Sequence, residues 1–124
     1  MWKGVVIQES LDDAALLAQA QVIGTREYAL EGTRDGRSLH FHKVIVSDEE
    51  KHGFVVAAAR AVKQGPWYIH LCRDDRIVVV YNDHIFEFSI KDKLKLQSAQ
   101  KYGVVVGIPE AQLDFGHLVQ NPYG

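Results

Sequence analysis

The order of predicted elements in the first part of the chain is the feature that most restricts its fold. Residues 2–8, 21–30, 38–46 and 67–73 are rich in β-branched and aromatic side chains, which is typical of strands. Helical patterns separate them, so that the order is strand, helix, strand, strand, helix, strand. This order predicts a mainly antiparallel sheet with helices packed on one face, which is the α+β class.

The two predicted helices begin at recognisable capping sequences. Ser10 with Asp13, and Ser47 with Glu50, have the spacing of a capping box. Apolar residues recur at helical spacing after each pair, which predicts one helix over residues 11–20 and a second that ends at a Gly-Pro pair.

A meander of three closely spaced strands is predicted in the second half of the chain. The strands span residues 67–73, 76–82 and 84–90. Residues 77–81 are apolar on both faces and are expected to be central, whereas the third strand alternates and is expected at an edge. Phe86 and Phe88 would then offer apolar surface there.

The remaining residues predict short elements. A polar helix is expected from Asp92 to a stop at Gly103, then a short strand or buried connector at 104–106 and a helical turn at 109–113. Because the chain contains no internal repeat, low-complexity tract or linker, residues 1–124 are predicted to form a single α+β domain.

Two topologies agree with this order of elements. The first is a ferredoxin-like β-α-β-β-α-β core, extended by a C-terminal hairpin and helices that leave part of one sheet face open. The second is an unrelated α+β topology built on an antiparallel meander.

Charge and cysteine content limit the classes of partner and compartment. Fourteen basic and sixteen acidic residues give a net charge of −2, which argues against general binding of nucleic acid. A nucleic-acid-binding module, ranked last, would need a local basic patch at Arg34, Arg37 and Lys43. Cys72 is the only cysteine, so a reducing, cytoplasmic location is expected. The apolar run at residues 1–7 is too short for a membrane span.

Two pairs of side chains have the spacing of metal ligands on strands. His40 and His42 share one face of their strand, and His70 and Cys72 share one face of another. If the strands were neighbours, these four residues would form a zinc site. The alternative is that they are solvated or hydrogen-bonded side chains on the polar face of a sheet.

Cys72 is also a candidate nucleophile. His70, His42 or His84 would act as its base, which requires a lowered thiol pKa and a cleft. The alternative is a small buried packing residue, because no Cys-His signature surrounds it.

The leading functional hypothesis is a non-enzymatic protein that binds a ligand or partner, or associates into a homo-oligomer, through an open sheet face. It requires no cofactor, and the glycines do not have the spacing of a phosphate-binding loop. The alternative is a metal-binding protein or enzyme that uses the His/Cys cluster, with zinc as its cofactor.

Overall fold

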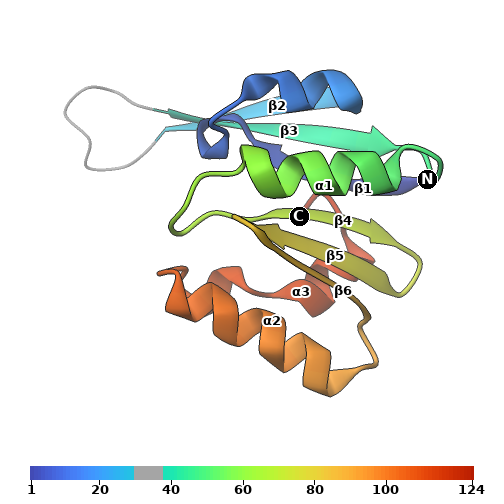
Figure 1. The fold of residues 1–124 in the computed structure, drawn as a ribbon, viewed down its shortest axis with the longest axis vertical. Helices are drawn as coiled ribbons and strands as arrows, with labels where there is room; N and C mark the ends of the chain where they lie inside the picture. Colours follow the sequence, from blue (N-terminus) through green and yellow to red (C-terminus); the bar gives the residue numbers. More distant parts are fainter. Residues whose placement is uncertain (30–37) are drawn as a thin grey trace.

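The computed structural model describes residues 1–29 and 38–124 (Figure 1). In these residues, six strands form one sheet in the order β2-β3-β1-β4-β5-β6, and every neighbouring pair is antiparallel. The strands are β1 (Trp2–Ile7), β2 (Gln21–Ala29), β3 (Ser38–Val46), β4 (Ile69–Arg73), β5 (Arg76–Tyr81) and β6 (His84–Ser89). The helices are α1 (Lys51–Ala61), α2 (Lys93–Val105) and α3 (Phe115–Gln120), with short 3-10 helices η1 (Gln8–Ser10), η2 (Ala14–Gln19) and η3 (Glu110–Gln112). The predicted α+β class is confirmed.

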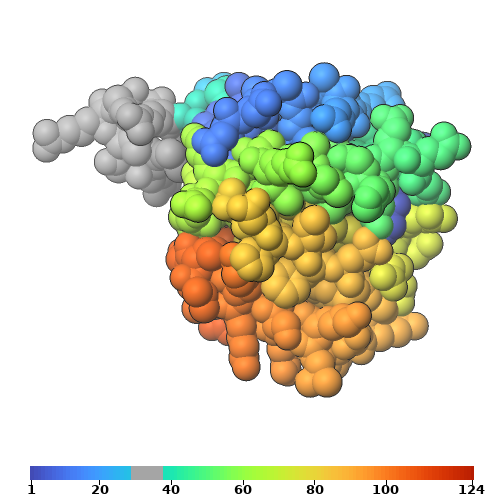
Figure 2. Space-filling model, in the orientation of Figure 1, coloured from blue at the N-terminus to red at the C-terminus, as the bar shows by residue number. Residues whose placement is uncertain are grey.

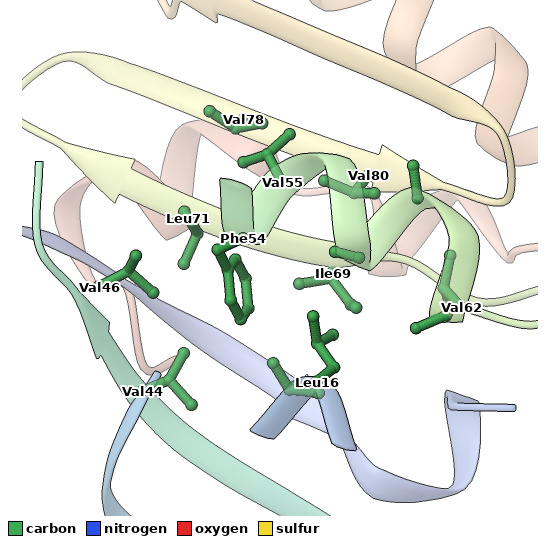
Figure 3. Packing of buried hydrophobic residues seen from close by; sticks show 14 of the residues in the cluster. Leu16, Val44, Val46, Phe54, Val55, Val62, Ile69, Leu71, Val78 and Val80 are labelled. Atoms are coloured by element: carbon green, nitrogen blue, oxygen red, sulfur yellow. The ribbon is translucent and has the colours of Figure 1, made fainter. Parts of the chain in front are cut away.

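One face of the sheet is covered by α1. Phe54 and Val55 of this helix belong to the same buried cluster as Leu71, Val78 and the other inward residues of β4 and β5 (Figure 3). The 3-10 helix η2 lies beside α1 on the same side of the molecule (Figure 2). Burial of each large apolar side chain stabilises the fold by roughly 1.5–3 kcal/mol, so this layer is a major source of stability.

The opposite face of the sheet is covered by α2 and α3. The prediction that the helices pack on one face only was therefore wrong. Ala99 and Phe115 from these helices pack against Ile77 and Val79 of β5. Strand β5 is buried on both faces because its alternate residues face the two helical layers. The predicted central position of this apolar strand is therefore confirmed.

The segment predicted as the first helix is not an α-helix. Leu11 forms an isolated antiparallel bridge with Val62 instead, and the backbone N–H of Asp12 donates to the carbonyl of Ala61 at 2.7 Å. These extended contacts prevent a helix from starting at residue 11. A 3-10 helix follows at η2, where the side chain of Asp13 accepts a hydrogen bond from a backbone N–H.

The end of α2 also differs from the prediction, because the helix continues through Val105. Gly103 lies within it, where a Cβ atom would come within 2.6 Å of the Leu113 side chain, so this glycine allows close packing and does not end the helix. The left-handed residue that follows the helix is Gly107, with φ of 99°. Val104 and Val105 are exposed and form no strand.

The first four strands lie in the order β2-β3-β1-β4, so β3 separates β1 from β2. This order is compatible with a split β-α-β arrangement. The ferredoxin-like part of the prediction is nevertheless not confirmed, because 3-10 helices replace the first of its two α-helices and α2 and α3 add a second helical layer.

Strand β6 is terminal in the sheet order, as expected, but its aromatic face is covered. Phe88 is buried and Phe86 is half-buried against α2, since both belong to the α2–α3 cluster. The expectation of exposed apolar surface was therefore wrong for Phe88, whereas Phe86 remains partly exposed. The predicted hairpin turn at 31–36, together with Arg34 and Arg37, lies outside the described residues.

Candidate functional site

The predicted metal-ligand pairs project from opposite faces of the sheet. Strand β1 lies between β3 and β4 and relates their side chains: Val6 pairs with His42, whereas Val5 pairs with His70. Paired residues project to the same face, and consecutive residues project to opposite faces. His42 therefore projects to the α1 face, and His70 to the α2–α3 face.

The predicted zinc site does not form. His40 shares the face of His42, and Cys72 shares the face of His70, so the sheet separates the two pairs. In residues 1–29 and 38–124, no group of three or more His, Cys, Asp or Glu side chains is arranged to hold a metal ion. The prediction required the two pairs of side chains to project to the same face of the sheet. The pairing of both strands with β1 places them on opposite faces.

His42 takes part in a hydrogen-bond chain at the surface. Its Nε2 lies 2.9 Å from Oε1 of Gln8, and its Nδ1 lies 2.8 Å from the hydroxyl of Thr25. An amide oxygen only accepts, so Nε2 carries the proton and Nδ1 accepts from the hydroxyl. Burial and the charge of His40 lower the pKa of His42, which favours this neutral form.

His40 lies between two carboxylates on the same face. Its Nδ1 is 3.0 Å from Glu9, and its Nε2 is 3.9 Å from Glu27. Burial acts to raise the pKa of Glu9, but hydrogen bonds from the backbone and imidazole of His40 lower it overall. The two histidines of β3 are thus hydrogen-bonded parts of the polar surface, which was the alternative expected for them.

Cys72 is buried, and this environment disfavours its thiolate. Burial raises the pKa of the thiol to about 12. The nucleophile of a cysteine enzyme is the thiolate, and its pKa is ordinarily lowered by a neighbouring base or helix terminus. Cys72 is 2 % exposed and packs with Ile77 and Val79, so the predicted nucleophile is a packing residue.

The other two predicted bases, His42 and His84, are also not placed to activate Cys72. His42 projects from the opposite face to Cys72. His84 is exposed, and its Nδ1 lies 2.8 Å from the hydroxyl of Tyr102, with the two rings 4.4 Å apart. Neither side chain supports a thiol-imidazole pair.

His70 is the one predicted site residue that lines an apolar cavity. Its side chain is buried, and its Nε2 donates to the carbonyl of Pro122 at 2.7 Å. Burial lowers its pKa to about 4, and the hydrogen bond to Pro122 offsets part of that effect. The imidazole is therefore neutral at physiological pH, with the lone pair on Nδ1 as its remaining acceptor.

The cavity has a volume of about 390 Å³ and lies against the sheet on the α2–α3 side. Its floor is formed by Val5 and Ile7 of β1 and by Leu39 and Phe41 of β3. The walls come from β4 and the segment before it, from η3 and α3, and from the two last residues. They are Pro66, Trp67, Tyr68, His70, Gln112, Leu118, Tyr123 and Gly124. Apolar side chains predominate in this lining.

The cavity exists because the two halves of this sheet face are covered differently. Helices α2 and α3 contact β4, β5 and β6. Over β3, the chain that follows α3 contributes one hydrogen bond, in which the Tyr123 hydroxyl donates to the carbonyl of Val44 at 3.3 Å. Figure 1 shows the C-terminus beside the middle strands, at the border between these halves.

Sequence reasoning missed this cavity, although one signal for it was present. Leu39 and Phe41 alternate with the two histidines of β3, so an apolar face on this strand was predicted. What covers that face depends on α3 and the residues after it, for which the sequence predicted no element. Two further cavities of about 340 and 470 Å³ are lined mainly by polar side chains, and so are weaker candidates.

In the described part of the chain, no helix combines the length and apolar character needed to cross a membrane. Comparisons with protein-family models, with curated proteins and with solved structures found no match.

Proposed function

We propose that this chain is a non-enzymatic binding protein whose ligand is a small, mainly apolar molecule held in the cavity between β1, β3 and the C-terminal segment. The observation that carries the proposal is the cavity itself, about 390 Å³ in volume and lined by Val5, Ile7, Leu39 and Phe41. Sites for small ligands are typically concave, mainly apolar and roughly 300–1,000 Å³ in volume, with a few polar groups that orient the ligand.

Hydrogen bonds hold the walls of this cavity in place. His70 donates to Pro122, and the Tyr68 hydroxyl donates to the carbonyl of Gln112 at 2.7 Å. Burial, the charge of Asp114 and the thiol of Cys72 raise the pKa of Tyr68 to about 12, so its hydroxyl remains a donor. A cavity with walls fixed in this way costs little conformational entropy when it binds a ligand.

His70 also favours one polar feature in the ligand. In its neutral form, with Nε2–H donating to Pro122, Nδ1 can accept a hydrogen bond but cannot donate one. A hydroxyl or N–H group on the ligand would complement this atom.

Binding of a neutral fluorescent probe, N-phenyl-1-naphthylamine, tests the proposal. We expect its emission to increase on titration with the wild-type protein. Leu39→Trp fills the cavity and is expected to weaken probe binding by about ten-fold or more. Leu94→Trp makes the same change on the exposed surface of α2 and is the matched control. The proposal fails if the wild type does not bind the probe, or if the two variants bind it equally well.

We also propose a second role for one surface, self-association of two copies through the edge strand β6. This strand is terminal in the sheet order, and Ile85 on it is 45 % exposed. Edge strands present backbone groups that can pair with another chain. Light scattering at high micromolar concentration should give a dimer mass for the wild type and a monomer mass for Ile85→Lys. A monomeric wild type would exclude this role.

A cytoplasmic location forms part of the proposal, because the single buried thiol of Cys72 suits a reducing compartment. Fractionation of cells that express the native chain would test it. Recovery from an oxidising compartment would contradict it.

A further inference from the structure

A second, basic cavity adjoins the apolar one. It has a volume of about 260 Å³, and its lining includes Arg26, Lys43, Gln120 and Asn121. Tyr123 and Gly124 line both cavities, so the two spaces meet at the C-terminal segment.

Strand register places the basic and apolar side chains on one surface. Arg26 of β2 pairs with Phe41 of β3, so these two side chains project to the same face. Lys43 lies two residues after Phe41 and pairs with Val5, which gives it the same orientation. The apolar floor at Phe41 and Val5 therefore passes directly into a cationic end at Arg26 and Lys43.

The ionised side chains that line this combined groove carry charge of one sign. Arg26 and Lys43 are cations at neutral pH, and His70 is neutral. Among the described residues that line either cavity, none is an Asp or Glu. Lys43 Nζ lies 5.6 Å from the centre of the Tyr123 ring, so this cation is positioned at the junction of the two spaces.

The amides near this end add hydrogen-bond donors. Gln120 and Asn121 each carry a side-chain NH₂ group, and the guanidinium of Arg26 presents a planar fork of donors that matches a carboxylate. An apolar space that ends in cations and neutral donors complements a molecule with an apolar body and a single anionic head.

We infer that the ligand is a small amphipathic carboxylate, with its apolar body against Leu39 and Phe41 and its carboxylate at Arg26 and Lys43. This inference rests on the proposed ligand-binding function and specifies its chemical class.

Octanoate and octanol, which share an apolar chain and differ in charge, test this assignment by displacement of N-phenyl-1-naphthylamine. We expect octanoate to compete about ten-fold better than octanol, since hydrogen bonds between ionised groups are the stronger ones. Added salt should weaken the binding of octanoate and leave the binding of octanol unchanged. Lys43→Gln and Arg26→Gln should each weaken the binding of octanoate and leave the binding of octanol unchanged. Lys101→Gln, on the exposed surface of α2, should change the binding of neither compound.

The outcomes separate this inference from the proposed function. If the probe binds in the cavity but octanol competes as well as octanoate, the carboxylate assignment is overturned and the apolar site stands. If the probe does not bind at all, the proposed function itself fails. If octanoate binds equally well to the wild type and to Leu39→Trp, its site lies elsewhere and the assignment is also overturned.

Discussion

The imidazole of His70, in the middle of the sheet, donates from Nε2 to the carbonyl oxygen of Pro122 at 2.7 Å. This hydrogen bond joins β4 to the residues after α3, and His70 together with the neighbouring Tyr123 lines the apolar cavity. Because the cavity depends on this attachment, the protonation state of His70 links the stability of the fold to the proposed site.

Stability is expected to fall on acidification because of His70. Burial lowers the pKa of this imidazole to about 4, whereas an ordinary imidazole has a pKa of 6.5. Between these values the unfolded chain takes up a proton that the folded chain does not. The stabilisation is therefore complete above pH 6.5, and as the pH falls to 4 the free energy of unfolding should decrease by about 3 kcal/mol.

Urea unfolding at several pH values between 7.5 and 4 would measure this effect. His70→Gln should lose this part of the pH dependence, whatever its stability at neutral pH. His52→Gln, at an exposed position of α1, should retain it. Equal pH dependence in the wild type and in His70→Gln would refute the assignment.

Gly4→Ala should strongly destabilise the sheet. A Cβ atom at this position would lie 1.7 Å from the backbone carbonyl oxygen of His70, in the strand that pairs with β1. Backbone atoms of a paired strand cannot move away as a flexible side chain can, so the expected cost is about 3 kcal/mol or more. Thermal and urea unfolding would measure it.

Gly53→Ala is the matched control for that substitution and should have the opposite sign. Gly53 lies within α1, and a Cβ atom there would meet nothing within 4 Å. Alanine favours a helix interior over glycine by about 1 kcal/mol, so this variant should be more stable than the wild type. A destabilised Gly53→Ala would show that α1 packs differently.

Tyr81→Phe should remove one buried hydrogen bond without leaving a cavity. The Tyr81 hydroxyl donates to the carbonyl of Ala99 at 2.8 Å and attaches α2 to the sheet. We expect the free energy of unfolding to fall by about 1 kcal/mol. Tyr28→Phe, on an exposed ring that packs edge-to-face with Phe41, should change the free energy of unfolding much less. Equal effects would contradict the assigned contact.

Cys72 should be unreactive in the folded protein. Its thiol is buried and its pKa is raised to about 12, so at pH 8 a thiol reagent such as 5,5′-dithiobis(2-nitrobenzoate) should label it only after denaturation. Ser98→Cys adds a thiol on the exposed side of α2 and should give rapid labelling of one group per chain. Rapid labelling of the native wild type would restore Cys72 as a candidate nucleophile.

Local patterns predicted most of the strands correctly. The apolar run at 77–81 is buried on both faces as β5, and Leu39 and Phe41 alternate with His40 and His42 along β3 as expected. These features depend on neighbouring residues in one strand, where side chains alternate with a period of two.

The ends of the helices, and the elements that cover each face of the sheet, were harder to predict. Glycine often ends a helix, but Gly103 lies inside α2. Because it has no side chain, Leu113 from a different element can pack closely against it. The 3-10 conformation before β2 likewise follows from contacts between Leu11 and Val62, which are distant in the sequence. Such choices depend on packing partners that local periodicity does not reveal.

The sequence by itself determined which side chains share a face within each strand: His40 with His42, and His70 with Cys72. Only the tertiary structure decided how those faces align, because β1 pairs His42 with Val6 and His70 with Val5. A shift of one residue in either pairing would reverse the relationship, and alternation within a strand carries no information about its phase relative to a neighbour. The same pairing places His70 beside Leu39 and Phe41 in an apolar cavity and leaves the two other histidines at the polar surface.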